Sequence, residues 1–578
     1  MIRLASFLLM LAVASQTEQY NADAPKTILE LQQFRQANSL RFRARTGAEG
    51  AATLVNLNPA TNAWFLLTVA WQGAPAEPPW HLENPHPRDA KVFLDEKYPA
   101  GLTISTGGER YACDLFGAGP AANALEQGRN STSIYYPLCG GRLLLRNPAK
   151  GRRTALESAT EFLRDQVWGG EKAIIMFHHL LADRYRETAA ASNVGAAAGG
   201  GTAGEPLPAL VDPATGTRPI QTENLGITLA SPGGMTPGAW YPAAGNTGVW
   251  VSVIQPNFIS SSILQKNKAL AGNLENVEAS SLCYLIAFDL DRFEVAYSRG
   301  TDYPGVGWSD RVTSKMKNPA LPGPDGIGTV APLVSTGLIA PEDGRRTVAA
   351  FTGGFKRSHG AFRYGDLSLK NHGSHYGFIE NGVVFSKLQP GLATIFMLRD
   401  GSLEMKTWTE ADNSRLGQIR YARQNGVPLA EFDPASQTTL PGRLVTKWGP
   451  GNWSGSEDDR LRTIRGGAAL QESALKGGTR RRFLIYAVFS DATPSAMARV
   501  FQAYRCSYAM LLDMNALEHT YLAYYRRSGS EMSVDHLIKG MSQLDQSVSG
   551  QVIPRFLGYP DNRDFFYVMH RNSKEVKR

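Results

Sequence analysis

Apolar and polar positions alternate in short runs over residues 27–151. Apolar runs of strand length fall at 51–57, 63–71, 101–105, 133–139 and 142–145, and turn residues separate most of them. Proline-rich connections at 74–79 and 84–88 separate some of these runs. This spacing of short runs and turns predicts a small β-rich module of the sandwich type.

The period becomes helical between residues 154 and 188. Apolar residues recur at helical spacing over 154–167 and 171–188, with Thr154 placed to cap the first helix. Residues 189–204 are almost entirely alanine, glycine, serine and threonine, a composition that buries too little apolar surface to fold alone. The sequence therefore predicts an N-terminal module at 27–188, an Ala/Gly-rich linker at 189–220 and a second domain at 221–578.

The second domain carries a longer series of apolar runs. Those of strand length fall at 248–254, 285–291, 347–355, 378–385, 394–398, 403–408 and 483–488. A helix is predicted over 496–504, with Thr493 as its N-cap and Pro494 at its first position. The predicted fold class is α+β, a mixed-sheet domain preceded by the β-rich module and its two helices.

The N-terminal residues 1–15 have the form of a short secretory signal, because one cation, Arg3, precedes an apolar run that ends in small residues. No later stretch approaches the roughly 20 apolar residues that a transmembrane helix needs. The sequence therefore predicts a secreted or periplasmic protein without an integral membrane segment.

Charge and cysteine content narrow the class of protein further. The net charge is +8 and the cations are scattered, with no recognisable nucleic-acid-binding module, so no nucleic-acid partner is expected.

Cys113 and Cys139 lie in one segment and form either a local disulfide or two buried thiols. Cys283 and Cys506 adjoin apolar runs and are expected in the core. Nothing in the sequence has zinc-ligand spacing, so no metal is predicted, and the sequence names no cofactor.

The run at 348–352 ends in Gly353-Gly354 and is followed by cations, which makes it the most informative stretch of the chain. Lys356 follows closely, and His372 and His375 come later in a second polar segment. Adjacent glycines after a buried strand are typical of a place where the backbone approaches a ligand closely. The alternative is a tight hairpin whose charges are solvated.

Several short motifs occur in a fixed order from this point. They are Gly353-Gly354-Phe355, then 376–382 and 395–401 with their Gly-containing turns, then 461–466, and finally the apolar run that ends at Asp513. Their succession resembles the phosphodiester glycosidase domain family, which includes the enzyme that uncovers mannose 6-phosphate. The chain differs from the family at two motifs, since Thr352 stands where Asn is usual and Met514-Asn515 follow Asp513 where the family has glycines.

The resemblance implies the roles of individual residues. It implies that Asp513, with His372, His375 or His519, transfers protons. It also implies that Lys356 and Arg462 hold a phosphate. Arg462 suits this role because its guanidinium can make two parallel hydrogen bonds to a phosphodiester. The substrate-binding residues implied are Gly353, Gly354, Lys356, Arg462 and Asn515. Residues 510–513 and 461–466 lie near predicted strand ends, so Asp513 and Arg462 are expected to share one site.

Two functions follow from the sequence. The first is an exported hydrolase that cleaves a sugar-phosphodiester or a related cell-surface glycan linkage, with a glycan or sugar phosphate as its substrate. The second is a glycan-binding or scaffolding protein that keeps the same fold without turnover.

Overall fold

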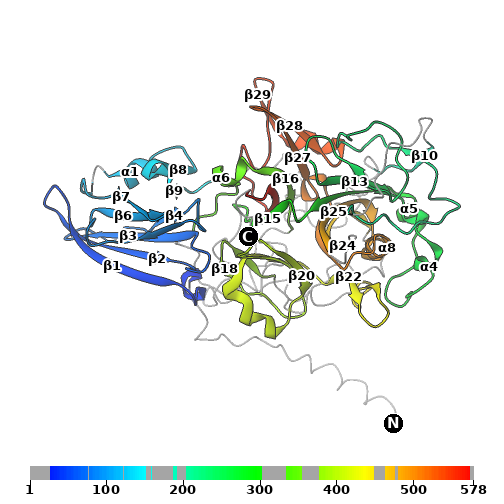
Figure 1. The fold of residues 1–578 in the computed structure, drawn as a ribbon, viewed down its shortest axis with the longest axis horizontal. Coiled ribbons are helices and arrows are strands. Elements are labelled where there is room, and N and C mark those ends of the chain that lie inside the picture. The colour runs from blue at the N-terminus through cyan, green and yellow to red at the C-terminus, as the bar shows by residue number, and fades with distance from the viewer. Residues whose placement is uncertain are drawn as a thin grey trace, which may run out of the picture.

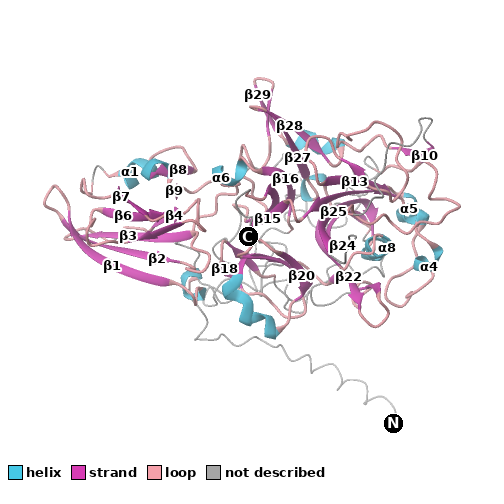
Figure 2. Ribbon diagram, viewed as in Figure 1, coloured by secondary structure: helices cyan, strands magenta, loops and turns pink. Residues whose placement is uncertain are grey.

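A computed structural model describes residues 27–75, 77–120, 123–151, 158, 186–191, 204–301, 333–354, 376–447, 462–474 and 480–572. The predicted signal at 1–15 lies outside these residues, as does nearly all of the two helices predicted at 154–188. Strands dominate the described part of the chain (Figure 2), and every pairing between its named strands is antiparallel. The predicted α+β class with a mixed sheet is therefore wrong. Many neighbouring strands are consecutive in the chain and joined by short turns, and such turns reverse the strand direction.

The N-terminal module consists of two antiparallel sheets (Figure 1, blue to cyan). The larger sheet has the order β1 (Gln36–Arg43), β2 (Glu49–Asn56), β3 (Trp64–Trp71), β4 (Trp80–Glu83), β9 (Leu143–Arg146) and β8 (Tyr135–Leu138). The smaller sheet has the order β5 (Ala90–Phe93), β6 (Gly101–Thr106) and β7 (Glu109–Asp114). Alternate side chains of both sheets, among them Leu54, Val69 and Ile104, pack into one core, as expected when two sheets pack face to face.

Short helices and a disulfide complete this module. The helices are η1 (Ile28–Leu31), α1 (Ala124–Arg129) and η2 (Cys139–Gly141). Cys113 on β7 and Cys139 are disulfide-bonded with their Cα atoms 5.4 Å apart, whereas Cys283 and Cys506 are buried free thiols. The bridge, which the sequence left open, ties the smaller sheet to the end of β8.

The C-terminal part is built on an eight-stranded antiparallel sheet. Its order is β12 (Tyr241–Pro242), β13 (Val249–Ile254), β14 (Cys283–Asp289), β25 (Arg480–Ala492), β24 (Thr463–Ala474), β26 (Tyr508–Met514), β22 (Pro428–Asp433) and β23 (Thr438–Pro441). Helix α8 (Pro494–Ala503) packs on one face of this sheet, and its residues Met497 and Phe501 share a core with Ile485 and Phe489. Thr493 accepts a hydrogen bond from the amide of Ala496, so the predicted cap and helix are confirmed.

Two five-stranded sheets lie beside the eight-stranded one. The first has the order β15 (Phe293–Ser298), β31 (Phe565–His570), β16 (Thr347–Thr352), β27 (Leu522–Ser528) and β28 (Glu531–His536). The second has the order β18 (Val383–Ser386), β17 (Phe378–Glu380), β21 (Ile419–Gln424), β19 (Ala393–Leu398) and β20 (Leu403–Thr407). The main core of the protein contains side chains from the first of these sheets and from the eight-stranded sheet.

The remaining described elements are short. They are β10 (Ala190–Ala191), β11 (Ile220–Gln221), η3 (Pro256–Phe258), α4 (Ser261–Leu264), α5 (Asn276–Ser280), α6 (Pro341–Gly344), η6 (Glu410–Gln418), η8 (Leu517–His519), η9 (Lys539–Leu544), β29 (Gln546–Val548) and β30 (Gln551–Ile553). None of the described helices is both long and apolar enough to cross a membrane.

The run at 378–385, predicted as one strand, is a hairpin of β17 and β18. Asn381 and Gly382 join the two strands with φ of 49° and 75°, both in the left-handed region. This pair of positive φ values is the geometry that an Asn-Gly dipeptide favours in a two-residue hairpin. The apolar pattern extended across the turn because residues on both sides of it are buried.

The N-terminal module packs directly against the C-terminal part. Trp64 of β3 and Phe385 of β18 contact each other edge to face, with ring centroids 6.0 Å apart, and both belong to the main core. Nearby, the buried Arg146 of β9 donates a hydrogen bond to the carbonyl of Val334 at 2.9 Å. The two parts therefore share one hydrophobic core in spite of their separation along the chain.

Part of the predicted linker is packed on the C-terminal part. The amide of Leu210 donates to the carbonyl of Ala503, and Trp240 donates to the carbonyl of Leu207 at 2.9 Å. Ile220 is buried in the main core. Residues 192–203 of that linker lie outside the described residues, so the boundary there stays a prediction.

Candidate functional site

Three chain segments that are distant in the sequence come together where β16 and β26 end. Thr352, the last residue of β16, pairs with Phe565 at the start of β31, and the amide of Gly353 donates to the carbonyl of Asp564 at 2.9 Å. The hydroxyl of Thr352 donates to the carbonyl of Glu518, which follows β26. Sheet pairing therefore places residues 353–354, 513–519 and 561–564 side by side.

Asp513 is buried at the end of β26, with 2% of its surface exposed. Its Oδ2 accepts a hydrogen bond from Nη1 of Arg563 at 2.8 Å, and its Oδ1 accepts one from the amide of Met514 at 2.9 Å. Burial raises the pKa of Asp513 to about 7, because the carboxylate has lost its water, and the Arg563 charge offsets only part of this effect. The carboxyl group therefore changes its charge near neutral pH.

His519 of η8 contacts the same guanidinium. Its Nε2 lies 2.6 Å from Nη2 of Arg563, and its Nδ1 lies 2.6 Å from the carbonyl oxygen of Met514. Because a guanidinium only donates, Nε2 is the acceptor and Nδ1 carries the proton that goes to the carbonyl. Both ring nitrogens thus have protein partners, and His519 orients Arg563 in this state.

Arg423 of β21 forms the second ion pair of the site. Its Nε donates to Oδ2 of Asp564, which also accepts a hydrogen bond from the Tyr297 hydroxyl at 3.0 Å. No described residue forms a hydrogen bond with Nη2 of Arg423 or with Oδ1 of Asp564, although both atoms are buried. Unsatisfied buried polar atoms are costly, so these two atoms mark the place where a polar ligand or another part of the chain fits.

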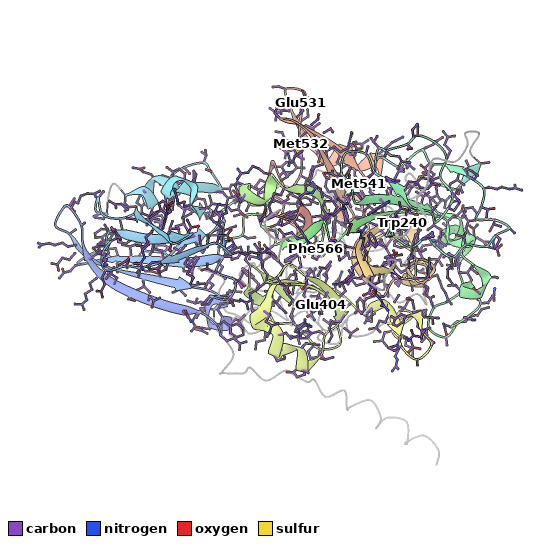
Figure 3. All side chains as sticks on the ribbon, in the orientation of Figure 1. Trp240, Glu404, Glu531, Met532, Met541 and Phe566 are labelled. Atoms are coloured by element: carbon purple, nitrogen blue, oxygen red, sulfur yellow. A yellow bond between two sulfur atoms is a disulfide. The ribbon has the colours of Figure 1, made fainter. Side chains whose placement is uncertain are left out.

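The two predicted glycines lie against this second ion pair. A Cβ atom on Gly354 would overlap Nη2 of Arg423, and one on Gly353 would lie 3.1 Å from the ring of Phe566, labelled in Figure 3. Neither glycine has a positive φ, so close packing accounts for them and an unusual backbone conformation does not. We call Arg423, Asp513, His519, Arg563 and Asp564 the Asp513 cluster.

The Asp513 cluster has a charge that depends on one proton. It holds two guanidinium groups and two carboxyl groups, and the sum is zero when both carboxyl groups are ionised. Protonation of Asp513, whose pKa is about 7, leaves a net charge of +1. A buried site of that charge favours an anionic ligand.

Arg462 and Asn515 lie at the same end of the eight-stranded sheet as Asp513. The amide of Asn515, which has a φ of 82°, donates to the carbonyl of Ile464 at 2.9 Å. The Arg462 side chain, however, pairs with Glu275 and lies 3.3 Å from Oδ1 of Asp491. Among the described residues, no hydrogen bond or ion pair joins Arg462 to Asp513. The expectation that these two side chains form one site is not met by their contacts.

The remaining predicted site residues, Lys356, His372 and His375, lie outside the described residues. Three members of the Asp513 cluster, Arg423, Arg563 and Asp564, were missed by the sequence reasoning. The signal for two of them was the run of four polar residues at 561–564, directly before the apolar strand β31. Arg423 sits inside an otherwise buried strand and had no comparable signal.

Among the cavities lined by described residues are one of about 670 Å³ and one of about 370 Å³, and neither of these two is lined by a member of the Asp513 cluster. In the described part of the chain, no group of three or more His, Cys, Asp or Glu side chains could hold a metal ion. No family model matches the chain, and no curated protein matches it. The fold and the site thus define a two-part, antiparallel β protein with a buried cluster of paired charges.

Proposed function

We propose that the protein is an exported hydrolase that cleaves the bond between the anomeric carbon of a sugar and a phosphate oxygen. The Asp513 cluster is its site. The observation that carries the proposal is the pairing of two buried guanidiniums with two carboxyl groups beside Gly353 and Gly354, where Nη2 of Arg423 has no partner among the described residues.

The chemistry fits the residues of the cluster. A water oxygen forms the new bond to the anomeric carbon, while the bond from that carbon to the phosphate oxygen breaks and its electrons leave with the phosphate. Ionised Asp513 takes the proton that the water loses, and a pKa near 7 suits such a transfer at neutral pH. Arg423 stabilises the leaving phosphate through Nη2.

The proposal gives Arg462 no part in the reaction, because its guanidinium is already paired with Glu275 and Asp491. His519 is a positioning residue that holds Arg563, and Arg563 in turn holds the Asp513 carboxylate.

Export is supported by the disulfide between Cys113 and Cys139, since such bonds persist mainly in oxidising compartments.

The test is an assay of the full chain with a nucleoside diphosphate sugar as the glycosyl phosphodiester, with release of reducing sugar as the readout. Asp513→Asn is expected to lower turnover by at least about a hundredfold with little change in substrate affinity. The matched control is Asp291→Asn, which makes the same chemical change at an exposed aspartate outside the Asp513 cluster. Equal turnover of both variants would contradict the assignment.

The second function, a glycan-binding protein without turnover, has its own supporting observation. Both oxygens of Asp513 and both ring nitrogens of His519 have partners within the protein. The same assay separates the two functions, because a binding protein would retain the sugar phosphate in a pull-down or titration and release no reducing sugar.

A further inference from the structure

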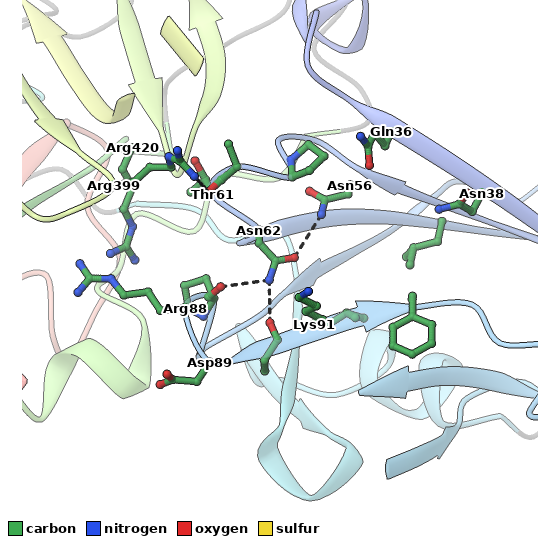
Figure 4. A pocket seen from close by; sticks show the side chains of 17 residues that line it. Gln36, Asn38, Asn56, Thr61, Asn62, Arg88, Asp89, Lys91, Arg399 and Arg420 are labelled. Carbon is green, nitrogen blue, oxygen red and sulfur yellow. Dashed lines mark hydrogen bonds between the residues drawn. The ribbon is translucent and has the colours of Figure 1, made fainter. Parts of the chain in front are cut away.

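A basic cleft lies between the N-terminal module and the C-terminal part, apart from the Asp513 cluster. Its volume is about 670 Å³ (Figure 4). Strands β1 and β2 and the segment 87–93 form its wall on the module side, and Arg399 and Arg420 come from the C-terminal part. The site therefore exists only when the two parts are docked.

Cations outnumber anions in the lining of this cleft. It contains Arg88, Lys91, Arg399 and Arg420 against the single carboxylate of Asp89, which is an excess of +3 (4 − 1). Lys91 and Arg399 are exposed. Arg88 lies 3.4 Å from Glu294, which also pairs with Arg346, so that carboxylate is shared between two guanidiniums. Such an excess attracts anions.

The cations are held in place by the backbone around them. Tyr421 lies opposite Met397 and Ile419 opposite Leu398, so Arg420 is the extra residue of a β-bulge, a feature that redirects a side chain. Arg399 donates to the carbonyl of Ala60 at 2.9 Å, across the junction of the two parts. The cleft is therefore preorganised for its ligand.

Asn62 fixes the segment that carries Arg88 and Lys91. Its Nδ2 donates to the carbonyls of Pro87 and Ala90, at 3.1 Å and 2.7 Å, and its Oδ1 accepts from Asn56, as Figure 4 shows. Asn62 has a φ of 58°, a conformation that asparagine tolerates better than most residues. The side-chain amide of Asn62 thus connects its own loop to β2 and to the segment 87–93.

The module side of the cleft presents neutral polar groups beside the cations. Gln36 and Asn38 are alternate residues of β1 and point to the same face, and Gln36 lies opposite Asn56 of β2. Primary amides both donate and accept hydrogen bonds, which matches the hydroxyl groups of a sugar, whereas guanidiniums match carboxylates.

We propose that this cleft binds an acidic oligosaccharide, with its carboxylates on the cations and its hydroxyls on the amides. The cleft does not depend on hydrolysis at the Asp513 cluster. Strand β21 nevertheless links the two places, because Arg420 lines the cleft and Arg423 belongs to the cluster, three residues or about 10 Å further along the strand. An acidic glycan held in the cleft would lie close to the second site.

The test is titration of the full chain with a short oligogalacturonate and with its neutral methyl ester. The acid is expected to bind at least about tenfold more tightly than the ester. Added salt is expected to weaken the binding of the acid and to leave the binding of the ester unchanged. Lys91→Glu should reduce the affinity for the acid by roughly tenfold or more. Lys97→Glu makes the same charge change on an exposed residue of the same module that does not line the cleft.

Three results would overturn the proposal. They are no binding of the acid, equal binding of acid and ester, and equal losses in the Lys91 and Lys97 variants. A single-stranded oligonucleotide that bound as tightly as the oligogalacturonate, and with the same dependence on Lys91, would replace the saccharide assignment by a general polyanion site.

Discussion

Nη1 of Arg563 donates a hydrogen bond to Oδ2 of Asp513 at 2.8 Å, although 50 positions separate the two residues in the sequence. Both side chains are buried, with 1% and 2% of their surfaces exposed. Removal of one partner leaves a buried charge without compensation, whereas removal of both leaves none.

This relationship predicts strong coupling between the two residues. Arg563→Met is expected to lower the free energy of unfolding by about 3–5 kcal/mol, because Asp513 is then stranded. The double variant Asp513→Asn with Arg563→Met should cost less than the sum of the single variants, as measured by urea denaturation. The exposed pair Arg45 and Asp114 provides a control cycle, in which the expected coupling is below about 1 kcal/mol. Additive losses at the buried pair would contradict its geometry.

Gly354→Ala is expected to destabilise the protein by about 1–3 kcal/mol, because the added methyl group overlaps Nη2 of Arg423, which is buried and held by Asp564. Gly354→Val should cost more. Thermal unfolding is the measurement, with Gly272→Ala as the control, since a Cβ there meets only the Ser495 hydroxyl at 3.7 Å. An unchanged melting temperature in both Gly354 variants would show that this glycine is not packed against Arg423.

Arg462→Ala is expected to lower stability by about 1–3 kcal/mol while the affinity for a phosphorylated sugar stays unchanged. The reason is that the guanidinium is used in ion pairs with Glu275 and Asp491. Urea denaturation and isothermal titration with a sugar phosphate measure the two effects, and Arg480→Ala, which removes an exposed ion pair, is the control. A large loss of affinity with unchanged stability would restore Arg462 to the binding site.

Glu83 is buried where the two parts meet, and its raised pKa predicts that the free energy of unfolding depends on pH. Burial raises its pKa from 4.5 to about 7, and Arg146 offsets part of that effect. The folded state therefore keeps a proton that the unfolded chain releases above about pH 4.5, so this contribution to stability is full below that pH and is lost as the pH rises to about 7.

Glu83→Gln should remove this dependence. The free energy of unfolding of the wild type, relative to that of Glu83→Gln, is expected to fall by a few kcal/mol between pH 4.5 and 7 in urea titrations. The exposed Glu49 of β2 supplies the matched control, Glu49→Gln. If the difference between wild type and Glu83→Gln is constant with pH, the carboxyl group of Glu83 does not titrate as described.

Local patterns predicted the elements that depend on neighbouring residues. The Thr493 cap with Pro494 defined the start of α8, and the apolar runs at 248–254 and 285–291 correspond closely to β13 and β14, because capping and strand burial are properties of short segments. The resemblance also selected Asp513 and the two glycines, which do lie side by side with 561–564 in the structure.

The sequence by itself therefore determined the position of several strands, among them β13, β14 and β16, and placed Asp513 near the end of β26. The tertiary structure alone decided that the sheets are antiparallel, that Arg462 pairs with Glu275, and that Arg423, Arg563 and Asp564 complete the Asp513 cluster. The basic cleft, too, is formed only by the docking of the two parts. The physical reason is that a strand pattern records which side chains are buried, whereas the partner of a buried charge is fixed by long-range pairing of strands far apart in the chain.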